Sequence, residues 1–422
     1  MRKLWQRYCE HRLLVNCALL AGLFFVNCFW GGMTYGVYPL LLLLVYFDSL
    51  PNAVTYLLFA VPFFELNVHV SVAMYLACVL VFMVRFYVVQ YLVEKKRPQN
   101  YRVLIMIGVL VAYCCLPIGP YNLNRVAKIC LLLIVFAILG MIGKAPHIFR
   151  LRLNTRVVAL ALVVAAAYAL LGTLSPYLRQ NAYFQAYVLG GNFIRFKALF
   201  VQPNNLAMVC EIVGAIFGYL IISQQGRLVD YILLFAVTIL GLLTFSKTLL
   251  ILLGIVYLAM FIWLLRVDLG RTVVVALVLV AIAFCACAVN PRIITVYVGR
   301  FVDGFASSQS FTDFMDVLTT ARYNLWVTYG SYLLKHPLAL LFGRGLGAAA
   351  LHGWATLSPH NFFLAMIYQL GLAGTGLFVA VVVVMVCGFL KGKTKRLHPA
   401  ICVPLIICGL LLCVEDFILY IF

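Results

Sequence analysis

A histidine and an asparagine open a long apolar segment near the C-terminal end of the chain. In SPHNFFLAMIYQLGLAG, Ser358 can cap a helix and Pro359 fits its first turn, so His360 and Asn361 are expected at a helix N-terminus. The backbone N–H groups there attract anions, and the positive end of the helix dipole favours a neutral histidine. A neutral imidazole could act as a general base near pH 7. A histidine that only caps the helix or contacts lipid would give the same pattern.

Cationic side chains stand beside the starts of other apolar runs. Arg195 and Lys197 shortly precede a run that begins with Pro203 and Asn204, and Lys247 lies in TFSK, a short turn between two apolar runs. Bidentate arginine and helix N-termini both suit a pyrophosphate, so these groups are candidates to hold one. A lone lysine in such a turn could instead extend its amine to the membrane surface.

Three further charged residues complete the candidate set. Arg322 lies on a helical-looking segment 38 residues before His360, and Arg344 lies in the glycine-rich FGRGLG between them. Glu211 is expected one or two turns inside the apolar run that begins at Asn204. An intramembrane carboxylate is a functional candidate, either binding an acceptor or pairing with an arginine, and a structural ion pair is the alternative.

Several familiar chemistries find no support in the sequence. It contains no Walker loop, no H-E-x-x-H and no G-x-S-x-G, and Asp313 and Asp316 in DFMD form only a weak candidate metal site. The 14 cysteines include no CxxC pair, and most lie inside apolar runs, where cysteine behaves as a small hydrophobic residue. We therefore expect neither a metal nor another cofactor, and ATP-driven and metal-hydrolase functions are disfavoured.

Composition determines the kind of structure that must position these residues. Of 422 residues, 66% are hydrophobic and only 10% are charged, which indicates a polytopic membrane protein. The apolar runs are continuous, so we predict an all-α fold with about 12–13 transmembrane helices in a single integral membrane domain, 1–422. The second and third spans are short enough to be re-entrant. The expected spans are 12–31, 34–47, 51–65, 70–93, 103–120, 125–143, 157–175, 204–223, 229–245, 248–266, 272–290, 361–390 and 398–421.

The distribution of charge predicts the orientation. The N-terminus and five loops that alternate along the chain carry 19 of the 31 lysines and arginines, and the positive-inside rule makes this set cytoplasmic. The candidate cations lie on the opposite, external side, where few are expected. The segment 291–358 is then a long extracytoplasmic loop that carries part of the site and an amphipathic helix suited to the membrane interface. The net charge of +19 reflects this topology and contacts with anionic lipids, not nucleic acid.

Four segments together resemble the O-antigen ligase and polymerase superfamily of bacterial envelope enzymes. They are RFKALFVQPNNLAMV, TFSKTLLILL, TTARYNLWVTYGSYLLKHPLALLFGRGLG and SPHNFFLAMIYQLGLAGTGLF, between about 195 and 378. The resemblance implies a metal-independent membrane glycosyltransferase whose donor is a polyprenyl-pyrophosphate-linked glycan. It acts on the outer side of the bacterial cytoplasmic membrane. Attack in one step on the donor sugar predicts inversion at its anomeric carbon.

The resemblance also implies residue roles. Arg195 and Arg322 become pyrophosphate ligands, and His360 becomes the base. We therefore expect His360 and Arg322 to be catalytic, and the following residues to bind pyrophosphate or glycan: Arg195, Lys197, Lys247, Asn204, Asn361, Arg344 and Glu211. Where the family usually has T-x-S-R, this chain has Thr244 to Lys247, and lysine lacks the bidentate fork.

Three functions remain open at this point. The first is a polymerase that joins undecaprenyl-pyrophosphate-linked repeat units into O-antigen or capsule, favoured because the external loop offers no obvious platform for a large acceptor. The second is a ligase that transfers the finished glycan to lipid A core or another acceptor. The third is a transporter or flippase of the same lipid-linked sugar, disfavoured because no internal repeat is visible. Expected partners are the glycan donor and acceptor, membrane lipids, and an associated flippase and chain-length regulator.

Overall fold

The computed structural model describes most of the chain and divides it into two compact units. The described residues are 2–29, 34–63, 68–89, 92, 101–116, 118–119, 123–174, 184–187, 193–200, 202–223, 225–289, 298–299, 302, 306, 310–319, 322–346, 348 and 359–391. The first unit comprises the described parts of Met1–Val89 and Pro146–Tyr297, and the second those of Gln90–Ala145 and Val298–Leu397. That both form one membrane domain stays a prediction.

The protein is all-α apart from one small hairpin within the described residues. The first unit contains α1 (Arg2–Phe29), α2 (Thr34–Phe47), α3 (Leu50–Ala60), the 3₁₀ turn η2 (Val61–Phe63), α4 (Val68–Val88), the 3₁₀ turn η4 (Pro146–Ile148), α7 (Leu151–Leu174), β1 (Phe184–Tyr187), β2 (Phe193–Phe196), α8 (Pro203–Ile222), α9 (Leu228–Leu242), α10 (Lys247–Val267) and α11 (Leu269–Val289). The second contains α5 (Tyr101–Cys114), α6 (Leu123–Lys144), α13 (Phe311–Thr319), α14 (Arg322–Lys335), α15 (Pro337–Phe342) and α16 (Phe362–Lys391).

Each of the first twelve predicted membrane spans contains a helix. Six helices among the described residues are long and apolar enough to cross a membrane: His11–Cys28, Ser71–Val88, Leu151–Leu171, Pro203–Ile222, Lys247–Val267 and Phe362–Met385. Six shorter apolar helices accompany them: Tyr35–Phe47, Leu50–Phe63, Arg102–Cys114, Lys128–Ile142, Leu228–Leu242 and Leu269–Cys285. These correspond one to one with the first twelve expected spans, and the span expected at 398–421 lies outside the described residues.

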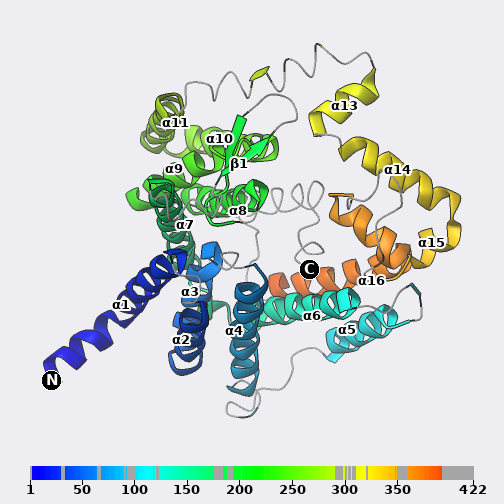
Figure 1. Ribbon diagram of the computed structural model, residues 1–422, viewed down its shortest axis with the longest axis horizontal. Coiled ribbons are helices and arrows are strands. Elements are labelled where there is room, and N and C mark those ends of the chain that lie inside the picture. Colours follow the sequence, from blue (N-terminus) through cyan, green and yellow to red (C-terminus); the bar gives the residue numbers. More distant parts are fainter. Residues whose placement is uncertain are drawn as a thin grey trace. The chain divides into compact units, whose positions relative to one another are not determined.

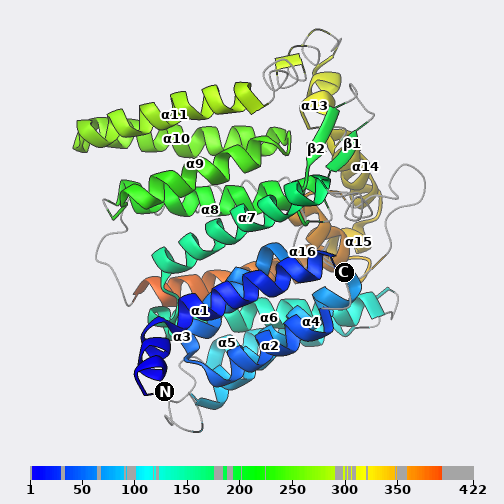
Figure 2. The same ribbon diagram turned by 60° about the vertical axis from the view of Figure 1, so that its left-hand side comes forward.

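In the first unit, α8 to α11 lie next to one another (Figure 2). Close approach of α8 to α10 depends on two glycines four residues apart, Gly214 and Gly218. A β-carbon added to Gly214 would lie 2.6 Å from Leu253, and one added to Gly218 would lie 2.7 Å from Val256. Small residues at this spacing are a standard means of packing membrane helices closely. The two glycines hold α8 and α10 in register, so the residues at the ends of these helices keep fixed positions relative to one another.

In the second unit, α16 packs against α5 and α6 (Figure 1). The helix is broken at Gly371, whose φ of 67° is left-handed and whose added β-carbon would clash with the carbonyl of Leu341. The Arg344 and Gly345 amides donate to the carbonyls of Tyr368 (2.8 Å) and Gln369 (2.9 Å), which precede the break. Backbone freed by the kink is therefore satisfied by the glycine-rich loop, which fixes that loop on α16.

Candidate functional site

The first group of predicted site residues begins at the hairpin. Strands β1 and β2 pair in antiparallel register with Gln185 opposite Arg195. The amide of Phe196 donates to the carbonyl of Leu243 at 3.0 Å, which ties β2 to the turn between α9 and α10. The hairpin therefore places Arg195 where the α9–α10 turn lies beside the start of α8.

Arg195 on β2 links the start of α8 to the α9–α10 turn, which is distant in the sequence. Its side chain is buried, its Nε donates to the carbonyl of Thr244 at 2.6 Å, and an Nη donates to the Oδ1 of Asn204 at 2.7 Å. Both of these acceptors are neutral oxygens, and together they orient the guanidinium. Two of the predicted ligand residues, Arg195 and Asn204, are thus in direct contact.

The turn from Thr244 to Lys247 is held by its own side chains. The Thr244 hydroxyl donates to the carbonyl of Gly241 at 2.6 Å, and the Ser246 Oγ accepts from the amide of Leu249 at 3.3 Å and so caps α10. Phe245 between them has a φ of 52°, in the left-handed region that a bulky residue rarely adopts. Backbone strain of this kind persists only where surrounding contacts impose it, and it gathers at functional sites.

Lys247 is the first residue of α10, at the positive end of the helix dipole. A cation is disfavoured there and an anion is favoured. Lys197 directly follows β2 and is half-buried, and its carbonyl accepts from the amide of Phe200 at 3.1 Å. Both lysines therefore border the segments that Arg195 joins.

Glu211 lies on α8, farther along the helix than Asn204. It follows Asn204 by seven residues, two helical turns on the same face of α8, or about 10 Å along the axis. Its side chain is 1% exposed. The predicted buried carboxylate is therefore present beneath the first group, inside the helix packing.

The second group lies at the start of α16, and here the predicted helix boundary was wrong. The helix begins at Phe362, and Asn361 is its cap, because the Asn361 Oδ1 accepts from the amide of Leu364 at 3.0 Å. His360 has a φ of 45°, which no helical residue adopts, so it and Pro359 precede the helix instead of forming its first turn. Ser358, the expected cap, lies outside the described residues.

Arg322 and His360 are connected through Trp326. Arg322 is the first residue of α14, and Trp326 follows it by one turn on the same face, about 6 Å along the axis. The indole Nε1 of Trp326 donates to the carbonyl of Pro359 at 2.7 Å, next to His360. The start of α14 thus lies near the start of α16.

Two helices, not one, form the predicted amphipathic segment. The side chain of Asp316 at the end of α13 accepts from the amide of Asn324 at 3.0 Å, and Asp313 accepts from the hydroxyl of Ser310 at 2.7 Å. Both carboxylates of DFMD are therefore used at helix starts. Among the described residues, no group of three or more His, Cys, Asp or Glu side chains could hold a metal.

The amphipathic helix α14 buries one apolar edge against α16. Tyr329 is 1% exposed, and its ring meets that of Tyr368 edge to face at 4.9 Å between centroids. Leu334 on another face is 77% exposed and remains available to the membrane interface. Arg344 lies over the ring of Tyr332, with its guanidinium carbon 5.8 Å from the centroid. Arg344 is therefore anchored within the second unit by a cation–π contact.

The predicted site residues thus form two groups, one in each unit. The first contains Arg195, Lys197, Asn204, Glu211 and Lys247, and the second contains Arg322, Arg344, His360 and Asn361. That the two groups share one pocket stays a prediction.

Sequence reasoning missed Trp326 and the carbonyl of Thr244. Trp326 could have been found, because its spacing of four from Arg322 puts both on one face of a helix. Arg125, which the predicted topology also puts on the outer side, is structural: it donates its Nε to the carbonyl of Cys114 at 2.8 Å and further N–H groups to Leu116 and Ile118, which caps the end of α5. Not every cation on the expected outer side is therefore a ligand.

Comparisons with known proteins add no relative. The chain matches no family model, no curated protein and no solved structure.

Proposed function

We propose that the protein is an integral-membrane inverting glycosyltransferase that polymerises undecaprenyl-pyrophosphate-linked repeat units into a cell-surface polysaccharide of the O-antigen or capsule type. Its site faces the exterior of the bacterial cytoplasmic membrane. The observation that carries the proposal is the convergence of Arg195, Asn204 and the Thr244–Lys247 turn. These are segments that the family resemblance assigns to the pyrophosphate.

The chemistry assigned to the first group is stabilisation of the leaving group. In the reaction an acceptor hydroxyl oxygen attacks the anomeric carbon of the donor sugar, and the bond from that carbon to the pyrophosphate oxygen breaks. Negative charge then grows on the departing polyprenyl pyrophosphate. Arg195, Lys247 and the helix N-termini of α8 and α10 supply oriented positive charge, which is worth most in a site with little water.

The chemistry assigned to the second group is proton removal. His360 takes the proton of the attacking hydroxyl, and Arg322 holds the pyrophosphate. The observation that supports these two roles is the hydrogen bond from Trp326 to Pro359, which brings the start of α14 toward His360. Attack in one step from the face opposite the leaving group inverts the configuration at the sugar carbon.

Purified full-length protein incubated with a synthetic undecaprenyl-pyrophosphate repeat unit tests the proposal. A polymerase gives a ladder of longer lipid-linked glycans without any added acceptor. His360→Ala should slow the ladder by about 10²- to 10⁴-fold. The matched control is His147→Ala, which changes an exposed histidine of η4 in the other unit and should leave the rate unchanged. Full turnover in His360→Ala would remove the base assignment.

The ligase is the second candidate and differs in its acceptor. A ligase gives no ladder with donor alone and transfers glycan only when lipid A core or another acceptor is added. The assay therefore separates the two enzymes.

The transporter alternative now has one structural feature in its favour, the break of α16 at Gly371. Broken helices in transporters expose backbone groups to substrate or ions. Here the carbonyls of Tyr368 and Gln369 accept from the 344–345 loop, and that of Leu370 accepts from the Tyr113 hydroxyl at 2.8 Å. The break is thus occupied by the protein's own backbone and side chains, which favours an enzyme.

A further inference from the structure

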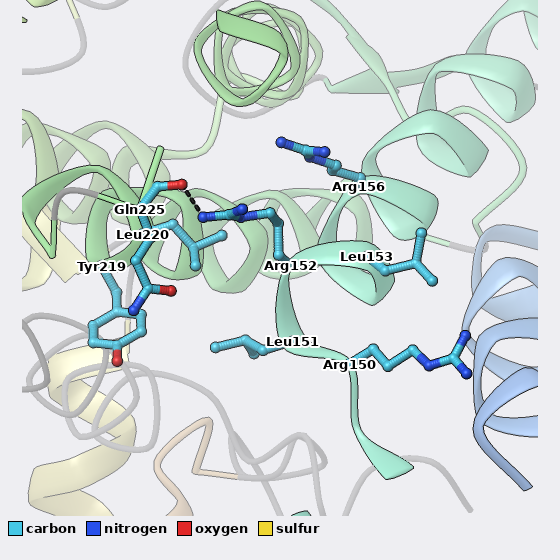
Figure 3. A pocket seen from close by; sticks show the side chains of 8 residues that line it. All are labelled: Arg150, Leu151, Arg152, Leu153, Arg156, Tyr219, Leu220 and Gln225. Carbon is cyan, nitrogen blue, oxygen red and sulfur yellow. Dashed lines mark hydrogen bonds between the residues drawn. The ribbon is translucent and has the colours of Figure 1, made fainter. Parts of the chain in front are cut away.

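A second cationic cluster lies at the other end of the first unit, away from the residues that the proposed function uses. Where α7 begins and α8 turns into α9, the surface is hollowed by about 520 Å³. Three arginines from one segment line the hollow, Arg150, Arg152 and Arg156, opposite Tyr219 and Gln225 (Figure 3). All belong to the first unit.

The three arginines are not equally engaged. Arg156 forms a bidentate pair with Asp230, with Nε–Oδ1 at 2.6 Å and Nη–Oδ2 at 2.9 Å, so its charge is neutralised. Arg150 reaches the neutral amide oxygen of Asn52 at 3.5 Å and points away from the other two (Figure 3). The cluster keeps a positive excess, because Asp230 is the one carboxylate among these contacts of the described residues.

Arg152 is the residue that points to a ligand. One Nη donates to the carbonyl of Gln225, while its Nε is buried and has no acceptor among the described residues. A buried guanidinium N–H without an acceptor is costly, and an anionic oxygen in the hollow would satisfy it. The backbone of Gln225, whose carbonyl accepts from Arg152, is itself held by a hydrogen bond from its amide to the carbonyl of Leu220 at 2.9 Å.

The backbone adds a second source of positive potential. Helix α7 starts at Leu151, and its first intrahelical bond runs from the Asn154 amide to the Arg150 carbonyl at 2.9 Å. The amides of Leu151, Arg152 and Leu153 lie before that bond, and these residues line the hollow. The first N–H groups of a helix bind phosphate oxygens well.

We infer that this hollow is a binding site for a phosphate group, held by Arg152 and the N-terminus of α7. The leucines around it, Leu151, Leu153 and Leu220, and its position at the ends of membrane-crossing helices suit the phosphate of an anionic phospholipid headgroup. A soluble phosphate shares the same chemistry. The inference does not depend on the proposed function.

Two binding measurements on the full-length protein test the site and identify the source. The first is the fraction of protein that carries one phosphatidylglycerol in native mass spectrometry, titrated in a phosphatidylcholine background. The second is the shift in melting temperature caused by inorganic phosphate against chloride at equal ionic strength. Arg152→Gln should weaken binding of the ligand by about tenfold or more.

The matched control is Arg266→Gln, which removes one exposed arginine from the last turn of α10 at the same end of the unit. It should change binding less than about twofold. If Arg152→Gln loses phosphatidylglycerol binding but keeps the melting-temperature shift with phosphate, the ligand is a lipid. If it loses the phosphate shift but keeps phosphatidylglycerol binding, the ligand is a soluble phosphate. Equal weakening in both variants, or no weakening in either, overturns the site.

Arg152→Lys serves if the glutamine variant does not fold, which its melting curve without ligand will reveal. Lysine keeps the charge but cannot place an N–H at the depth of the Arg152 Nε, so binding should still fall several-fold. Unchanged binding in a folded Arg152→Lys protein contradicts the inference.

Discussion

Arg195 and Arg156 lie at opposite ends of the helices α8, α9 and α10 and have different hydrogen-bond acceptors. At the end where α8 and α10 begin, Arg195 donates to the Asn204 amide and the Thr244 carbonyl, both neutral. At the end where α9 begins, Arg156 is paired with the buried carboxylate of Asp230. Arg195 thus donates to neutral oxygens, whereas Arg156 is paired with a full negative charge.

This difference separates binding from stability. A carboxylate cancels the arginine charge and leaves a neutral, fold-stabilising pair, whereas a neutral oxygen fixes the direction of a guanidinium without bringing a negative charge to it. The first end also has two helix N-termini and Lys247, and a cation there weakens α10 unless an anion is near. We therefore expect substitutions of Arg195 to affect turnover and those of Arg156 to affect folding.

The largest effect should come from Arg195→Lys. Lysine carries its donors on one nitrogen and lacks the fork with which Arg195 reaches the Asn204 oxygen and the Thr244 carbonyl, so the positive charge loses its orientation. Turnover in the ladder assay should fall on the order of 100-fold, the cost of one lost electrostatic contact to a developing charge.

The control for that variant is Arg156→Lys, the same change at the opposite end. It should leave turnover per folded molecule unaltered. If both lysine variants reduce turnover equally, or if Arg195→Lys is fully active, the ends do not differ in the way described.

A stability effect comes next, at the second end. Arg156→Gln leaves the carboxylate of Asp230, which is 0% exposed, without its partner. Removing one member of a buried pair costs about 3 kcal/mol of unfolding free energy. Thermal unfolding in a single detergent measures it, with turnover per folded molecule unchanged.

The matched pair is Arg271 with Asp268, 3.1 Å apart and about one third exposed on both sides. Arg271→Gln should cost less than about 1 kcal/mol, because exposed pairs contribute little. Equal losses in the two variants would show that burial of the carboxylate is not what stabilises this end.

The sequence was informative about helices and their starts for a physical reason. The thickness of hydrocarbon sets the length of an apolar run, so runs mark helices directly. Proline and serine mark two of the starts, with Pro203 as the first residue of α8 and Ser246 as the cap of α10. These features depend only on neighbouring residues, so they can be predicted from the sequence.

Contacts made through the backbone could not be predicted. The acceptor of Arg195 is the main-chain carbonyl of Thr244, 49 residues away, and any residue type provides a carbonyl. The break at Gly371 could not be predicted for the same reason. Glycines are common in membrane helices, and the sequence of α16 does not indicate that backbone amides of a distant loop bond to it. The left-handed turn at His360 likewise moved the helix start by one turn.

A smaller effect tests what connects the two ends. Gly218→Ala puts a β-carbon 2.7 Å from Val256, so α8 must shift on α10 and both clusters shift with it. The expected cost is about 1–2 kcal/mol in unfolding free energy. Gly254→Ala on α10 is the control, because its added β-carbon meets nothing within 4 Å and alanine favours a helix. Similar melting temperatures for both variants would argue against tight α8–α10 packing.

The smallest effect is a dependence of stability on pH that comes from Asp48, another buried carboxylate of the first unit. Asp48, between α2 and α3, accepts from the Tyr56 hydroxyl at 2.6 Å and pairs with Arg12 at 3.2 Å. Burial alone raises the pKa of Asp48, but the bonds from Tyr56, Ser49 and Asn52 and the charge of Arg12 outweigh it, so the pKa is lowered below its ordinary value.

A lowered pKa in the folded state fixes the sign of the effect. The ionised form of Asp48 stabilises the fold above the unfolded pKa of about 4, and this stability is lost as the pH falls through the lower, folded value. The melting temperature of the wild type should therefore fall from pH 5 toward pH 3 more steeply than that of Asp48→Asn. The difference between the two curves isolates Asp48 from Asp230, which both proteins keep. A difference that stays constant across that range would mean that Asp48 acts through packing and not through its charge.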